Sequence, residues 1–224
     1  TTIFTTLSSV RKWEKQQKKR WEQNAKFWIN IIHKKLDPFR ETVTNAAILD
    51  SLPKKKLKVL DAGCGEGYLS RMMAQQGMNV FGIDLSQTLI KAALIEERKN
   101  SLNIQYRVKD MRKTSFPSSS FDVVVSHQSI HEIPDPQKAL NEFARILKKE
   151  GRLFLLFLHP CFDFPPDQKR KQTIAQYYIQ KGKIQKEYYL VGGLKSPAPY
   201  SYLHLSLEDW VRIIFDAGFD IVNI

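Results

Sequence analysis

From residue 58 onward, short apolar runs alternate with longer stretches in which apolar residues recur every three or four positions. The first pattern predicts β-strands and the second predicts amphipathic helices. We predict strands at residues 58–62, 79–84, 104–109, 121–126, 152–158 and 220–224. The ends of the helices between them are predicted from capping and terminating residues. Gly77 ends the first helix and Ser86 caps the second. Asp135 and Pro136 begin the third helix, which Gly151 ends, and Ser206 caps the last helix, at 207–217.

The first 52 residues have helical periodicity only. A helix is predicted over residues 8–36, where tryptophans recur on one face: Trp13, Trp21 and Trp28. We interpret Trp13 as a packing residue. A second helix is predicted to begin at Pro38, with Asp37 as its cap, and to run to about Leu52.

Alternating strands and helices of this kind predict an α/β fold, a Rossmann-like open and mostly parallel sheet with helices on both faces. We expect an N-terminal helical cap at residues 1–52 and the main domain at 53–224, with a lid insertion at about 160–205 after the fifth strand. Ligands of such sheets bind at the carboxyl ends of the strands.

Composition narrows the class of protein. Hydrophobic residues make up 42% of the chain, and no apolar run reaches the roughly 18 residues of a membrane span. Two cysteines do not form a disulfide framework, so we expect a cytoplasmic protein. The net charge of +12 could attract nucleic acid, but the lysines fall in separate patches and no nucleic-acid-binding module is visible. We therefore expect no nucleic-acid partner and no membrane, and the resemblance described below implies a small-molecule partner.

A glycine-rich loop follows the first predicted strand. Three glycines alternate with other residues in it: Gly63, Gly65 and Gly67. This spacing differs from the G-x-G-x-x-G pattern of dinucleotide-binding folds, which argues against a nicotinamide-dependent dehydrogenase. Asp61 precedes the loop, and Asp84 ends the second strand, where a carboxylate can accept hydrogen bonds from ribose hydroxyls. Asp110 ends the third strand, where it could meet an adenine amino group.

Residues 59–160 resemble the class I methyltransferases that use S-adenosyl-L-methionine (SAM), in particular the small-molecule branch grouped as type 11. The segments that carry the resemblance are VLDAGCGEG, GIDLS, KDM, FDVVVSHQSIHEI and ALNEFARILKKEGRLFL. The resemblance implies an enzyme of small-molecule, perhaps secondary, metabolism that leaves S-adenosyl-L-homocysteine (SAH) as product. It also implies a seventh, antiparallel strand, which we expect beyond Ile224.

The resemblance assigns the cofactor contacts. The methionine part of SAM is lined by Gly63, Gly65, Ser126 and His127, and its carboxylate pairs with Arg40. The ribose is held by Asp84, and the adenine is contacted by Leu85, Asp110 and Met111. The alternative for Arg40 is an ordinary surface cation, and for His127 a role confined to the cofactor.

Methyl transfer needs a base only if the acceptor loses a proton. Three histidines follow the fourth and fifth strands: His127, His131 and His159. His159 is the first choice as base, while His131 could instead cap or pack. Glu132 is a weaker candidate that we expect to be a solvated helix residue. No metal site is predicted.

The insertion at 160–205 is rich in tyrosine, and a hairpin arm is expected over residues 184–191 with Gly192–Gly193 at its turn. We expect Tyr177, Tyr188 and Tyr202 to contact a flat or apolar acceptor under this lid. The alternative is that the tyrosines pack the insertion on the core.

The acceptor atom, nitrogen, oxygen or carbon, stays open, and so do two rival functions. A nucleic-acid methyltransferase is the runner-up, although residues 126–129 lack the (Asn/Asp)-Pro-Pro-Tyr motif of base-amine methyltransferases. A non-catalytic SAM-binding protein is the other.

Overall fold

A five-stranded parallel sheet forms the centre of the molecule. The computed structural model describes residues 7–161, 178–179, 181–185 and 188–224. The strand order is β3-β2-β1-β4-β5, and each neighbouring pair runs parallel. The strands are β1 (Lys58–Ala62), β2 (Asn79–Asp84), β3 (Gln105–Val108), β4 (Phe121–His127) and β5 (Leu147–Leu156). The order reverses between β1 and β4, the point at which ligands of open α/β sheets bind.

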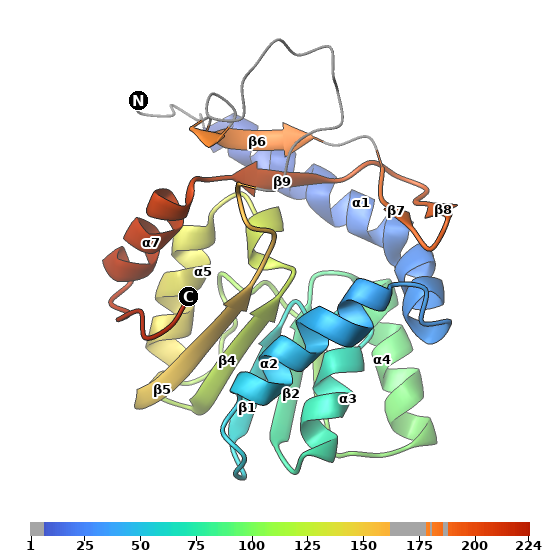
Figure 1. Cartoon of the computed structure of the whole chain (residues 1–224), viewed down its shortest axis with the longest axis vertical. Coiled ribbons are helices and arrows are strands. Elements are labelled where there is room, and N and C mark those ends of the chain that lie inside the picture. Colours follow the sequence, from blue (N-terminus) through green and yellow to red (C-terminus); the bar gives the residue numbers. More distant parts are fainter. Residues whose placement is uncertain (1–6, 162–177, 180, 186–187) are drawn as a thin grey trace.

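Helices cover both faces of this sheet (Figure 1). They are α3 (Tyr68–Gln75), α4 (Gln87–Lys99), α5 (Pro136–Ile146) and α7 (Leu207–Asp216), with the 3₁₀ turn η2 (Ile130–Glu132) after β4. Successive residues of β1 point to opposite faces. Val59 therefore packs in the cluster formed with α3 and α4, and Leu60 in the cluster formed with α5 and Trp210 of α7. This arrangement confirms the predicted Rossmann-like fold.

The N-terminal residues are helical as predicted. They form α1 (Leu7–His33), the π-helical turn η1 (Arg40–Thr44) and α2 (Asn45–Ser51). The carboxylate of Asp37 accepts a hydrogen bond from the Arg40 amide at 3.1 Å, which is the expected cap. Figure 1 shows α1 lying across the end of the sheet, under β9.

The insertion after β5 contributes two small antiparallel ladders. β6 (Gly182–Gln185) pairs with β9 (Ser201–His204), and β7 (Leu190–Val191) pairs with β8 (Leu194–Lys195). Gly192–Gly193 make the turn where we predicted it, with positive φ at both residues, but the arm is only two residues long. Ile184 instead pairs with Tyr202. The Gln17 side chain donates to the Ser201 carbonyl at 2.7 Å and so joins the insertion to α1.

Two predicted boundaries are wrong. The helix begun by Pro136 ends at Ile146 and not at Gly151, because the buried Leu147 leaves the helix to pair with Phe121 at the start of β5. Residues 220–224 do not form the expected sixth strand. They have no ladder partner in the described part of the chain, and Val222 is 94% exposed. No helix among the described residues is long and apolar enough to cross a membrane.

Candidate cofactor and acceptor site

The glycine loop folds toward Asp84. The Gly65 amide donates to Oδ2 of Asp84 at 3.0 Å, and the Ser86 amide donates to Oδ1 at 2.8 Å. Gly65 has φ +58°, and a Cβ built there meets nothing within 4 Å, so open space lies above the loop. The carboxylate of Asp84 therefore holds the glycine loop in addition to facing the cavity.

Two carboxyl groups under the loop have raised pKa values. Burial raises the pKa of Asp61 to about 7, although the Ser70 hydroxyl donates to it at 2.6 Å. Burial likewise raises the pKa of Asp84 to about 6, against the hydrogen bonds from Ser86 and Gly65. Groups of this kind favour a cationic ligand, because a nearby positive charge stabilises their ionised form.

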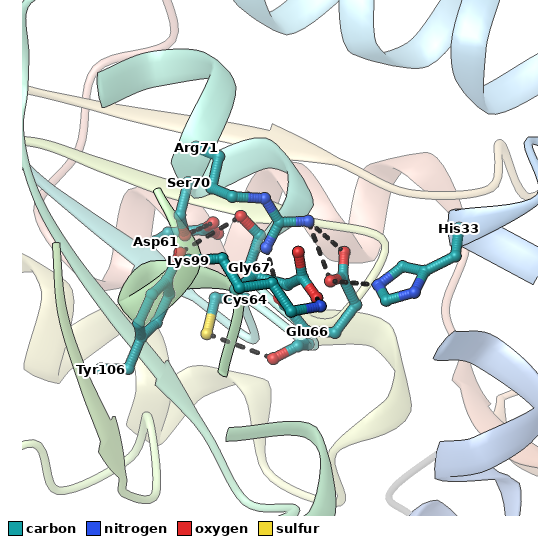
Figure 2. Close-up of polar contacts among 11 residues, drawn as sticks. His33, Asp61, Cys64, Glu66, Gly67, Ser70, Arg71, Lys99 and Tyr106 are labelled. Atoms are coloured by element: carbon teal, nitrogen blue, oxygen red, sulfur yellow. Dashed lines mark hydrogen bonds and ion pairs between the residues drawn. The ribbon is translucent and has the colours of Figure 1, made fainter. Parts of the chain in front are cut away.

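An ion-pair cluster fixes the second half of the loop (Figure 2). Glu66 has a fully buried side chain, and Arg71 of α3 donates to both of its carboxylate oxygens at 2.9 Å. His33, at the end of α1, approaches the same carboxylate at 3.3 Å from the other side. The Tyr106 hydroxyl donates to the Gly67 carbonyl at 3.3 Å. The loop is therefore braced by α1, α3 and β3.

A cavity of about 740 Å³ opens at the carboxyl ends of β1 to β4, beneath α1. The predicted site residues that line it are Arg40, Asp61, Gly63, Gly65, Asp84, Leu85, Asp110, Met111, His127 and His131. The volume falls within the range of roughly 300–1,000 Å³ that is usual for small-molecule sites. The structure thus brings most of the predicted cofactor residues to one hollow.

Arg40 and His127 both line the cavity, and their electrostatic interaction affects the pKa of His127. The Arg40 guanidinium lies 5.5 Å from the centroid of the Trp28 ring, and 3.6 Å separates its Nε from Oδ2 of Asp37. Burial and the charge of Arg40 lower the pKa of His127 to about 3, so its imidazole is neutral at physiological pH. Two buried nitrogens on the cavity wall, Nε2 of His127 and Nε1 of Trp28, have no hydrogen-bond partner among the described residues.

The cavity continues beyond β4 into an aromatic end. Tyr189 stacks on Tyr200 with 3.8 Å between ring centroids, and its edge meets Trp28 at 4.9 Å. Tyr189 also donates through its hydroxyl to Oε1 of Glu132 at 2.8 Å. Glu132 is 7% exposed and lines the cavity, so the expectation of a solvated residue is wrong. The reason is that η2 turns inward under α1 and the insertion.

Known proteins can now be set beside this geometry. Residues 60–155 match the family model described as "Methyltransferase domain". Over residues 60–155, which make up less than half of this chain, the sequence is therefore similar to methyltransferase domains. A "Ubiquinone biosynthesis O-methyltransferase" of Coxiella burnetii is 34% identical over 104 residues, and one of Xanthomonas oryzae pv. oryzae is 38% identical over 103. Each match covers 46% of this chain, and it covers 44% and 43% of the two relatives respectively, so the chain spans less than half of their length.

Solved structures share the fold of this chain over a larger part of its length. A putative SAM-dependent methyltransferase from Listeria monocytogenes has a TM-score of 0.68 at 21% identity and covers 84% of this chain and 85% of that one. Phosphoethanolamine N-methyltransferase 2 of Haemonchus contortus, solved with SAM, has a TM-score of 0.59 at 25% identity. It covers 78% of this chain, which covers 36% of that one.

Several predicted residues lie elsewhere. Ser126 is fully buried outside the cavity lining, and its hydroxyl lies 2.8 Å from that of Ser129, which donates to the Ala62 carbonyl at the end of β1. His159 is exposed outside the lining of the main cavity, where its Nδ1 accepts from the Cys161 amide at 3.2 Å. The structure therefore gives no geometric support to His159 as the base.

The predicted substrate tyrosines are also displaced from the main cavity. The centroid of the Tyr188 ring lies 3.9 Å from Nζ of Lys195. Tyr202 is buried beside His131, with 6.2 Å between the centroids of their rings. Neither lines the main cavity, whereas their neighbours Tyr189 and Tyr200 do. Tyr177 lies outside the described residues. Adjacent tyrosines gave sequence reasoning no signal to decide which ring faces inward.

Proposed function

We propose that this protein transfers the methyl group of SAM to a small-molecule acceptor and releases SAH. The observation that carries the proposal is the cavity above the glycine loop, in which Gly65 is held against Asp84 with open space over it. In-line methyl transfer gains most from holding donor and acceptor in alignment, which can contribute up to roughly 7–11 kcal/mol. A partly enclosed cavity beneath α1 suits that role.

In this proposal the cofactor lies along the strand order. Asp110 and Met111 after β3, with Leu85 after β2, contact the adenine, and Asp84 holds the ribose. Gly63 and Gly65 after β1 contact the methionine part. Arg40 pairs with its carboxylate as a charge-assisted contact. Asp61 and His127 complete the methionine end, which points the methyl group toward β4.

The acceptor then occupies the part of the cavity beyond β4. Trp28, Tyr189 and Tyr200 line that part, which favours a flat or apolar molecule. The names of the curated relatives favour an oxygen acceptor. The domain that carries the family match ends at residue 155, so these three aromatic residues lie outside it.

Substitution of Asp84 tests the proposal. We expect Asp84→Asn to weaken SAM binding by about 10- to 100-fold, because a charged hydrogen bond contributes roughly 1.5–3 kcal/mol. Asparagine keeps the shape of the side chain, but its single carbonyl oxygen can accept only one of the two backbone amides that bind the carboxylate, so the thermal unfolding of the variant is compared with wild type as well. Asp122→Asn, at the surface outside the cavity, is the control. Titration calorimetry with SAM gives the affinities, and labelled SAM with a pool of cell metabolites gives transfer. Equal affinity in wild type and Asp84→Asn would refute the cofactor placement.

The alternative acceptor is a nucleic acid. It is favoured by Lys15, Lys18 and Lys19, three exposed residues of α1 that lie along the cavity. Phosphate-driven binding falls steeply with salt. Retention of RNA or DNA at low salt and its loss at moderate salt would support this alternative, while SAM binding without transfer to any pool would point to a non-catalytic protein.

A further inference from the structure

The strand order separates the cavity into two ends. The proposed cofactor contacts follow β3, β2 and β1 in spatial order, so the transferred methyl group lies toward β4. Past β4, η2 and Leu158 form the wall of the cavity, and α1 and Tyr189 close over it. An ionisable side chain in this second end faces the acceptor side of the reaction.

Glu132 is that side chain, and contacts from separate segments hold it. Its Oε1 accepts from the Tyr189 hydroxyl at 2.8 Å, and Trp21 of α1 donates to its carboxylate as well. Its backbone carbonyl accepts from Gln17 of α1 at 2.6 Å. A carboxylate at the surface would be hydrogen-bonded by water and would not require these donors from the protein. Glu132 is instead a buried acid on a ligand cavity, with a fixed orientation.

We propose that Glu132 is the proton acceptor of the reaction, and that the methylated atom of the substrate is one that carries a hydrogen. This inference rests on the proposed methyl transfer and specifies its acceptor end. The acceptor atom forms a bond to the methyl carbon as the bond from carbon to sulfur breaks. The electron pair of the broken bond stays on sulfur, giving neutral SAH. The hydrogen leaves the acceptor as a proton to the Glu132 carboxylate, and from there passes to water.

The histidines are poorer candidates on this geometry. His159 is outside the cavity lining, and the neutral ring of His127 has a pKa near 3, too low for an effective base at neutral pH. The ring of His131 lies between Phe157 and Tyr202, at 6.3 and 6.2 Å between centroids. The Glu132 carboxylate instead contacts Trp21 and Tyr189.

The proposal has a defined pH dependence. Burial raises the pKa of Glu132 to about 8, the donors Tyr189 and Trp21 lower it, and the charge of Asp84 raises it. Other charged or titratable groups that line the cavity include Arg40, His127, His131, Tyr200 and, on α1, Glu14, Lys15, Lys18 and Lys19. Because the base must be ionised, turnover should rise with pH through the pKa of Glu132. The sulfonium of SAM is a cation, so its arrival should lower that pKa and release a proton, whereas neutral SAH should release less.

Proton release provides a test that needs no acceptor. Binding of SAM and of SAH is measured by calorimetry near neutral pH in buffers of different ionisation enthalpy. We expect wild type to release more protons with SAM than with SAH. Glu132→Gln should bind SAM but show a smaller difference, because only Asp61 and Asp84, whose pKa values burial also raises, then release protons. Glu132→Asp keeps a carboxyl group and should keep the difference. Glu96→Gln, on the outer side of α4, is the matched control.

Turnover gives the second readout, with labelled SAM and the metabolite pool. Glu132→Gln should lose about 100-fold or more in rate, as expected for removal of a general base. Tyr189→Phe removes a donor to the carboxylate, so the pH profile should move to higher pH, which a merely structural role would not cause. Failure of wild type to bind SAM would refute the proposed function. SAM binding with the same proton release in wild type and Glu132→Gln would refute only the role of Glu132.

Discussion

Substitution of Gly67 by alanine should destabilise the protein through two separable effects. Gly67 begins α3 and has φ +86°, a conformation that L residues rarely adopt. A Cβ built on Gly67 lies 2.4 Å from the hydroxyl oxygen of Tyr106 and 2.7 Å from its Cζ. The Tyr106 ring is 7% exposed and packed in the core between β3 and α3, so it has little room to move.

The size of the effect follows from these two terms. Left-handed backbone costs a residue with a Cβ roughly 1–2 kcal/mol. Forcing an added carbon into a packed core costs roughly 1–3 kcal/mol more. We therefore expect Gly67→Ala to lower the free energy of unfolding by about 2–5 kcal/mol, which for a chain of this size corresponds to a fall in Tm of about 5–15 °C.

A double-mutant cycle separates the terms. Urea unfolding is measured for wild type, Gly67→Ala, Tyr106→Leu and the double variant. Removing the ring should reduce the cost of Gly67→Ala to the backbone part, about 1–2 kcal/mol, leaving a coupling of about 1–3 kcal/mol. If alanine at 67 costs the same in both backgrounds, the contact with Tyr106 is not its cause. If it costs nothing in either background, the left-handed conformation itself is in question.

Two further predictions concern residues outside the cavity. Burial would raise the pKa of Glu142, but hydrogen bonds from Arg145 and Thr114 lower it to about 2. The stability that Glu142 contributes should therefore be present above its unfolded pKa and be lost as pH falls from about 5 toward 2. Urea unfolding at several pH values should show a weaker loss of stability in acid for Glu142→Gln than for wild type. An equal loss in both proteins would contradict the assignment. His159→Ala should leave SAM affinity and turnover within about twofold of wild type, because small surface changes are usually near neutral; a large loss of turnover would return His159 to the site.

The cofactor half of the molecule was predictable because its signals are local. Ser86 and Asp135 accept hydrogen bonds from amides three residues later, as cap residues do. The Gly65 amide lies 3.0 Å from Oδ2 of Asp84, because β1 and β2 are parallel and their carboxyl ends lie at the same edge of the sheet. Each of these positions is determined by a few residues of sequence and by the topology.

Other features depend on contacts that sequence spacing does not record. Gly151 resembles a helix end, but a Cβ built there would lie 2.9 Å from Leu147, so this glycine instead allows close packing within β5. Glu132 sits in a polar-looking turn, and its burial comes from α1 and the insertion, which are distant in sequence. A single polar residue in a predicted turn does not indicate which distant segments will pack over it.

The acceptor end follows the same logic. Its walls come from α1, η2 and the segment around Tyr189 and Tyr200, whereas the family match spans residues 60–155 and contains only η2 of these. In the proposed function, the region that matches the family model is the part that holds SAM. Because Trp21 and Tyr189 contact Glu132 from outside that region, the proposal assigns the choice of acceptor to segments beyond the family match. Exchange of these segments should therefore change the acceptor and leave SAM affinity largely unaltered.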